Sequence, residues 1–231
     1  MKSLVGERRA VAAAVLSFYG FVYLLFSMAM PSEWTTLFWC IAGLYGVAFV
    51  GVVAGWFWGR WFAQGLGYWG LVTGVLGVWQ MGPEPIIVFL TLSHAVVALF
   101  LAGDAMAAGF DGRPEWRARF HLDEGGVDRL GKSVTRASMS LPILLMWALA
   151  PTQPSSLFAH GTPAVLVPVA LAAAGAWALL RLRTWGLFAL AGSAGAVIAV
   201  SAATPVAIAA VAALAAALVP FAAPMGRALR A

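Results

Sequence analysis

Long apolar runs separated by short polar breaks cover most of the chain. A helix needs about 20 apolar residues to cross the hydrocarbon core of a bilayer. Eight runs reach roughly that length, and glycine, proline or charged residues mark the breaks between them. The pattern predicts an all-α, polytopic integral membrane protein with transmembrane helices at residues 10–30, 35–58, 62–82, 86–108, 134–150, 163–181, 184–202 and 204–222.

The fifth and the first of these runs need separate comment. The fifth is short, so its helix is expected to begin earlier, near Val127, in a polar stretch. Asp128 and Lys132 are four residues apart in that stretch, a spacing that favours an ion pair on one helix face. The first run is longer than the core of a signal peptide, and no small-x-small cleavage site follows it. It is therefore interpreted as a retained first span.

The composition agrees with a membrane protein. Of the 231 residues, 62% are hydrophobic and 10% are charged, whereas soluble domains contain about 25% charged residues. A soluble fold of this length could not bury so much apolar surface, so the excess is expected to face lipid. Membrane lipid is the first partner that the sequence predicts.

The distribution of basic residues predicts an orientation. With eight crossings, all 14 Lys and Arg residues fall at the termini and in the loops on one side. Loops rich in Lys and Arg remain in the cytoplasm. We therefore expect a multi-pass protein of the cell inner membrane with both termini cytoplasmic. The same bias accounts for the net charge of +5, which consequently indicates no nucleic-acid partner.

Two parts of the chain resemble each other. Residues 21–38 and 141–158 match at an offset of 120 residues, including a proline, a Leu-Leu pair and a Leu-Phe pair. Pro85 and Pro205 match at the same offset. These positions favour a tandem repeat of two four-helix units. Because each unit has an even number of spans, a pseudo-two-fold axis along the membrane normal would relate the two copies.

The repeat hypothesis also sets the domain boundaries. A Trp-Gly-Leu tripeptide at 69–71 recurs at 185–187 if a four-residue gap is allowed. The first unit then covers 1–108 and is rich in Trp, Tyr and polar residues, whereas the second covers 134–231 and is rich in Ala. The two units would be joined by a cytoplasmic linker at 109–133.

The linker itself is expected to contain a short helix that lies in the membrane interface. Pro114 suits the first turn of a helix. Trp116 and Phe120 are four residues apart and share one helix face, while nearby arginines can reach lipid phosphates.

Polar side chains inside the spans concentrate in the first unit. Counting about 1.5 Å per residue from the outer helix ends places Tyr23, Tyr45, Thr73 and His94 at similar depth near mid-membrane. These four are the candidate ligand-binding residues. In one hypothesis His94 binds a ligand, relays a proton or ligates a pigment metal. In the other, a neutral imidazole bonds Tyr23 or Tyr45 and fixes the packing of the helices.

Asp104 raises a separate question, because it lies toward the cytoplasmic end of the fourth run. The dipole at a helix C-terminus disfavours an anion, so Asp104 is expected to pair with a cation. Arg60, at the cytoplasmic end of the second span, is the first candidate. This pair would lock two helices at the interface.

The sequence offers little catalytic or metal-binding chemistry. Cys40 is the single cysteine, which excludes an intrachain disulfide and a multi-cysteine metal site. His121 and His160 fall in loops on opposite sides, which excludes a bis-histidine haem within the chain. A pigment ligated through His94 alone remains open, and no cofactor is assigned. No catalytic residue is predicted, since phosphate-loop, HExxH, Gly-x-Ser-x-Gly and CxxC motifs are absent from the sequence.

Three functional hypotheses follow. The first is a non-enzymatic membrane protein that packs against partner helices, in other subunits or a homo-oligomer, or binds a lipophilic molecule. The second is a transporter of a small or lipophilic solute with a central polar layer around His94. The third is a membrane enzyme that acts on a lipid-like substrate with His94 as base. The first is preferred, because transporters and enzymes usually keep several polar groups at mid-membrane.

Overall fold

The computed structural model describes residues 3–110, 124–153, 163–201 and 203–228, and all regular structure within these ranges is helical. The elements are α1 (Ser3–Ala29), α2 (Ser32–Ala54), α3 (Gly59–Met81), α4 (Pro85–Phe100), α5 (Asp104–Phe110), α7 (Glu124–Leu149), the 3-10 turn η1 (Pro163–Val165), α9 (Leu166–Leu180), α10 (Trp185–Val200) and α11 (Pro205–Ala228).

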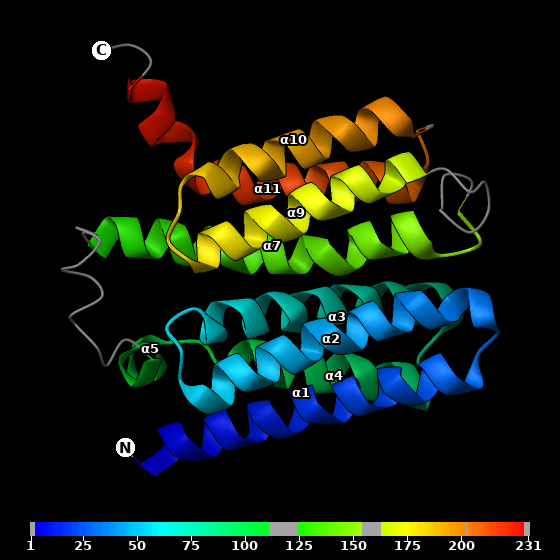
Figure 1. Cartoon of the computed structure of the whole chain (residues 1–231). Helices are drawn as coiled ribbons and strands as arrows, with labels where there is room; N and C mark the ends of the chain where they lie inside the picture. Colours follow the sequence, from blue (N-terminus) through cyan, green and yellow to red (C-terminus); the bar gives the residue numbers. More distant parts are fainter. Residues whose placement is uncertain (1–2, 111–123, 154–162, 202, 229–231) are drawn as a thin grey trace.

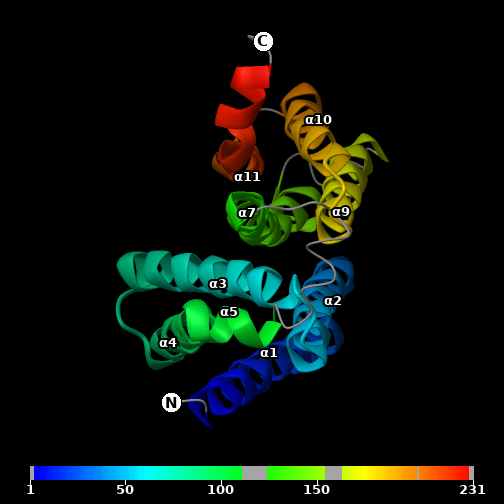
Figure 2. The ribbon, with the colours of Figure 1, turned by 90° about the vertical axis from the view of Figure 1, so that its left-hand side faces the viewer.

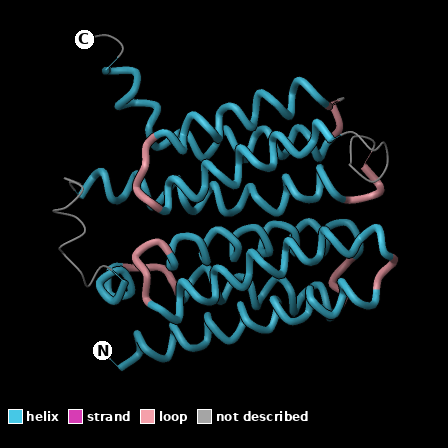
Figure 3. Tube along the Cα trace, in the orientation of Figure 1, coloured by secondary structure: helices cyan, strands magenta, loops and turns pink. Residues whose placement is uncertain are grey.

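The helices form two four-helix bundles that lie against each other (Figures 1 and 3). The first bundle contains α1 to α4, and the second contains α7, α9, α10 and α11. The bundles meet chiefly through α3 and α7, with a smaller contribution from α2, and Figure 2 shows this junction end-on. α1 and α7 run in the same direction. The start of α1 and the last turn of α11 lie at the same end of the molecule (Figure 1).

The apolar helices support a membrane protein. Within the described residues, four helical segments are long and apolar enough to cross a membrane: Val5–Ala29, Ser32–Ala54, Pro163–Leu180 and Pro205–Ala222. A fifth results if α4 and α5 together count as one span. α10 is apolar but has only 16 residues, and the first half of α7 carries charged side chains. Each of the eight predicted runs contains a helix, but length and composition identify fewer than eight as spans.

The predicted span at 86–108 is wrong as a continuous helix. α4 ends at Phe100, Gly103 adopts φ +94°, and α5 continues at an angle of 74°. Arg8 of α1 stabilises this break because its guanidinium donates to Leu99 O at 3.0 Å and to Ala102 O at 2.8 Å. The carbonyls that lose their helical partners at a helix end are therefore satisfied by a charged donor.

Arg9 caps a second helix in the same way. Its guanidinium donates to Val52 O at 2.7 Å and to Val53 O at 2.6 Å, at the C-terminal end of α2. Two adjacent residues of α1 therefore cap the ends of two different helices. The basic residues at this end of the first bundle serve the fold directly.

α7 begins at Glu124, which confirms that the fifth helix starts in the polar stretch before its apolar run. The predicted ion pair is also confirmed, with Lys132 Nζ 2.7 Å from Asp128 Oδ2. The interfacial helix expected around Pro114 to Phe120 lies outside the described residues.

Two glycines permit the close contact between the bundles. A Cβ at Gly65 of α3 would overlap the Ser138 hydroxyl and the Thr135 carbonyl of α7. A Cβ at Gly131 of α7 would lie 2.6 Å from the Trp61 ring of α3. Gly65 of α3 thus leaves room for side-chain and backbone atoms of α7, and Gly131 of α7 leaves room for the Trp61 ring of α3. Such small positions let helix backbones approach closely in a membrane.

The packing of the bundles differs from a pseudo-two-fold arrangement. Such an axis would relate α3 to α10 and α7 to α1, so α1 and α10 would meet as α3 and α7 do. Instead α1 and α10 lie on opposite outer faces of the molecule (Figures 1 and 2). Gly70 faces His94 of α4, whereas its counterpart Gly186 faces Gly175 of α9, so the matched tripeptides pack differently. The tandem repeat stays a hypothesis.

We predict that Gly65→Ala lowers the thermal unfolding temperature in mild detergent, because the new methyl group meets a backbone carbonyl that cannot move aside. Overpacking of this kind costs about 1–3 kcal/mol. Gly46→Ala is the matched control, since a Cβ at Gly46 meets nothing within 4 Å. Equal unfolding temperatures for the two variants would refute the proposed role of Gly65.

Candidate functional site

His94 lies at the centre of an aromatic cluster in the first bundle. It belongs to α4 and its side chain is 1% exposed. Tyr45 of α2 is equally buried, and its hydroxyl lies 2.6 Å from His94 Nε2. His94 Nδ1 lies 2.8 Å from Leu90 O, one turn earlier in α4. Of the four candidate ligand-binding residues, Tyr45 and His94 are therefore in direct contact.

The two hydrogen bonds define the protonation of the ring. A carbonyl oxygen only accepts, so His94 Nδ1 must donate to Leu90 O. In the neutral imidazole the other nitrogen then accepts from the Tyr45 hydroxyl. Both ring nitrogens are thereby used. A metal or a substrate proton could engage His94 only by displacing one of these partners, and this geometry favours the packing role.

Gly70 of α3 provides the space for the imidazole. A Cβ at this position would overlap the His94 ring. Gly67 and Gly74, one turn to either side, face the α4 backbone at His94 and Ala98 and at Thr91, respectively. The glycines of α3 thus form the surface on which α4 packs, and His94 fills the hollow that they leave.

Tyr19 is a member of the cluster that depth counting missed. Its ring centroid is 4.2 Å from that of His94, and its hydroxyl is 2.6 Å from Ser93 Oγ. Depth counting selected Tyr23 on the same helix, one turn away. The four-residue spacing of these tyrosines could have identified Tyr19, because residues i and i+4 share a helix face.

The remaining candidate residues have different positions. Tyr23 contacts Tyr45 through its ring, with centroids 5.4 Å apart, and therefore lies beside the cluster. Thr73 does not join it: its side chain is exposed, and its hydroxyl donates to Trp69 O of its own helix at 2.9 Å. A hydroxyl that bonds its own backbone needs no polar neighbour.

The structure does not bring Asp104 and Arg60 together in an ion pair among the described residues. Asp104 is exposed and is the first residue of α5, so it sits at a helix start and not at a helix end as the sequence had indicated. An anion is stabilised by the dipole at that position, which removes the need for a cation. Arg60 lies with its guanidinium 5.8 Å from the centroid of the Trp61 ring.

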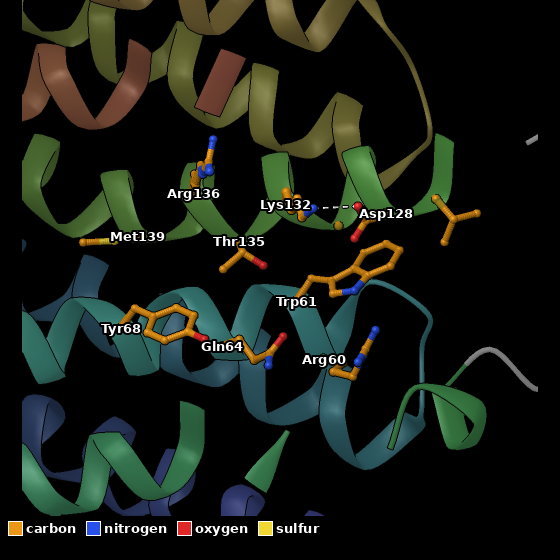
Figure 4. Close-up of a pocket in the computed structure, with 11 residues that line it drawn as sticks. Arg60, Trp61, Gln64, Tyr68, Asp128, Lys132, Thr135, Arg136 and Met139 are labelled. Atoms are coloured by element: carbon orange, nitrogen blue, oxygen red, sulfur yellow. Dashed lines mark ion pairs between the residues drawn. The ribbon is translucent and has the colours of Figure 1, made fainter. Parts of the chain in front are cut away.

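Arg60 borders a larger feature that sequence analysis did not anticipate, a groove between α3 and α7 with a volume of about 570 Å³ (Figure 4). We call it the interbundle groove. Its lining residues on α3 are Arg60, Trp61, Gln64 and Tyr68. Those on α7 are Val127, Asp128, Gly131, Lys132, Thr135, Arg136 and Met139.

The interbundle groove has a charged end and a less polar end. Arg60, Asp128 and Lys132 lie at the end where α3 and α7 begin, whereas Tyr68 and Met139 lie further along both helices (Figure 4). Arg136 points away from α3 and donates to Ala216 O of α11 at 3.0 Å. The lining is therefore amphipathic along its length, which suits a molecule with a polar head and an apolar body.

A second cavity, of about 320 Å³, lies between α1 and α4 beside the cluster. Its lining is almost wholly apolar, with Phe18, Phe26 and Phe89 among its residues. The Tyr19 hydroxyl at its edge is already bonded to Ser93. This cavity offers an apolar surface but little to orient a ligand, so the interbundle groove is the better candidate site.

Comparison with known proteins gives no further guide to the site. The chain matches no protein family, no curated protein and no solved structure.

If the cluster is a packing element, Tyr45→Phe should lower the unfolding temperature in detergent. The substitution leaves His94 Nε2 buried without its donor, at an expected cost of about 1 kcal/mol. Tyr23→Phe is the control, because Tyr23 contacts Phe26, Phe38 and Tyr45 through its ring, which the substitution keeps. A Tyr45→Phe protein as stable as the control would show that the hydrogen bond contributes nothing.

Proposed function

We propose that this protein is a non-enzymatic integral membrane protein that holds a lipophilic molecule in the interbundle groove. The observation that carries the proposal is the amphipathic lining of a 570 Å³ groove at the junction of two helical bundles. Ligand sites of this size commonly combine an apolar wall with a few polar groups that fix orientation, and they often lie at such junctions.

The length of α7 supports a groove that extends below the lipid headgroups. The uncharged part of α7, residues 137–149, spans about 20 Å at 1.5 Å per residue, less than the ~30 Å hydrocarbon core. If α7 crosses the membrane, part of its polar first half must lie below the headgroups. Ser133 donates to Ala217 O at 2.7 Å and is fully buried, so the polar segment is sheltered by protein at this position. The groove then lies where lipid headgroups and chains meet.

The same contacts favour binding over catalysis and transport. An enzyme would need an activated nucleophile or base in the groove, but Asp128 is exposed and paired with Lys132. A transporter built on His94 would need a ring nitrogen that can engage the solute, and both are bonded within the cluster. Holding a ligand requires neither.

The proposed topology has eight crossings, with both termini in the cytoplasm and the protein in the cell inner membrane. Its support is the position of the charges. Arg8, Arg9, Arg60 and Lys132 lie at one end of the helices, as does Arg183 between α9 and α10 (Figure 1). The opposite end carries Glu33, in the first turn of α2, and Glu84, just before α4. The positive-inside rule assigns the basic end to the cytoplasm.

The binding proposal predicts that Met139→Trp reduces the amount of lipophilic material that copurifies with the protein. The larger ring occupies the less polar end of the groove, and overpacking of about 1–3 kcal/mol corresponds to a loss of about fivefold or more in affinity. Native mass spectrometry of the protein released from mild detergent would measure the bound fraction. Val75→Trp, at an exposed position of α3, is the control. Equal retention in both variants would refute the site.

The topology predicts a sidedness of cysteine labelling. In a Cys40→Ser background, Glu84→Cys should react with a membrane-impermeant maleimide in intact spheroplasts. Thr184→Cys should react only after the membrane is permeabilised, because it lies at the basic end. Labelling of residue 184 from outside would reverse the orientation. Labelling of both residues from one side would contradict the number of crossings between them.

A further inference from the structure

We infer that the molecule held in the interbundle groove is a phospholipid with an anionic headgroup, oriented with its phosphate toward Arg60 and Lys132. This inference rests on the proposed function and adds the chemical class of the ligand. It is argued from the charges, the aromatic residues and the open end of the groove.

Two cations face the groove at its charged end. Arg60 comes from the first turn of α3, and Lys132 comes from the third turn of α7 (Figure 4). They approach from opposite walls, so a phosphate between them could contact both. Arginine and lysine are the side chains that usually bind phosphate, the first through a planar fork and the second as a point charge. Arg136 is not counted, because it points to α11.

Among the described residues that line the groove, Asp128 is the one carboxylate, and it competes with an anionic ligand for Lys132. The competition is weak, because the side chains of Lys132 and Asp128 are 58% and 62% exposed. Exposed ion pairs of this kind contribute little stability. A phosphate can therefore take over Lys132 at small cost, and Asp128 can turn to solvent. The Asp128 carboxylate also repels an anionic ligand, so its neutralisation should strengthen the binding of that ligand.

Trp61 fixes the geometry of the charged end. Its side chain is buried against Gly131 of α7, and the Arg60 guanidinium lies 5.8 Å from its ring centroid. Trp residues favour the level of the lipid headgroups. Trp61 therefore places Arg60 at the depth where a lipid phosphate would lie, and the position of the cation follows from packing rather than from a mobile surface chain.

The other end of the groove suits acyl chains. Tyr68 is 40% exposed, and Met139 lies opposite it on α7. Methionine is flexible enough to adapt to irregular apolar groups. Acyl chains could leave the groove at this end and enter the surrounding bilayer, so only the headgroup and the first part of each chain need be enclosed. A soluble phosphate compound would leave this apolar end unused.

The test compares three probes by native mass spectrometry of the full-length protein in mild detergent. The probes are a dioleoyl phosphatidylglycerol, a dioleoyl phosphatidylcholine with the same chains, and glycerol phosphate without chains. Wild-type protein should retain the anionic lipid at least about fivefold more than the zwitterionic one, the factor expected for one cation near an anionic headgroup. Glycerol phosphate should not bind measurably.

Three variants then test the direction of the effect. Lys132→Gln should reduce binding of the anionic lipid about fivefold, and Asp128→Asn should increase it by a similar factor. The double variant Lys132→Gln/Asp128→Asn carries the same net charge as wild type and should bind almost as wild type does. All three changes lie at exposed positions, so the fold should be retained. A purely structural ion pair would give the same loss of stability in both single variants and no opposite change in lipid binding.

The outcomes separate this inference from the proposed function. If wild type retains both lipids equally and Met139→Trp reduces both, the groove binds lipid and the anionic preference is wrong. If Met139→Trp leaves both unchanged, the groove is not the site and both proposals fail. Binding of glycerol phosphate as tightly as of the lipid would assign the site to a soluble phosphate compound instead. A rise in salt should weaken the anionic lipid selectively, and an unchanged ratio would also contradict the inference.

Discussion

The close contact between α3 and α7 is the interaction on which the rest of the architecture depends. Gly65 leaves room for Ser138 and Thr135 of α7, and Gly131 leaves room for Trp61 of α3. The two four-helix bundles can therefore pack closely against each other. The same contact borders the interbundle groove, since Trp61 and Gly131 are among its lining residues. In lipid this matters more than in water, since apolar burial alone gives helices little reason to associate.

A second constraint is that every polar group within the membrane needs a partner. Most of the described polar groups meet it in three ways, whereas the buried Trp147 Nε1 has no hydrogen-bond partner among the described residues. Arg8 and Arg9 cap the ends of α4 and α2, hydroxyls such as that of Thr73 bond their own helix, and His94 uses both ring nitrogens. Each solution satisfies the group within the protein, so polarity inside these helices is mostly a feature of packing. The interbundle groove differs, because Asp128 and Lys132 remain exposed at one end.

Sequence reasoning succeeded where a signal was local. Helices occur in all eight predicted runs, Pro85 and Pro205 each open a helix, and α7 starts in its polar stretch. The contact between His94 and a tyrosine was also anticipated. Sequence reasoning failed where a residue far away in the sequence determined the local structure. The break after α4 depends on Arg8, which is 91 residues from Leu99, and depth counting assumed a straight helix. Depth counting also treated the Thr73 hydroxyl as available to other helices, although it bonds the backbone of its own helix.

By itself, the sequence determined that the chain is helical and suited to a membrane, because apolar periodicity and the position of charges are properties of short segments. Only the tertiary structure decided which helices meet. Whether a glycine is exposed, like Gly46, or faces another helix, like Gly65, depends on the rotation and neighbours of its helix. The interbundle groove has the same origin. Arg60 and Lys132 are 72 positions apart in the sequence, and no local pattern relates them until α3 and α7 pack together.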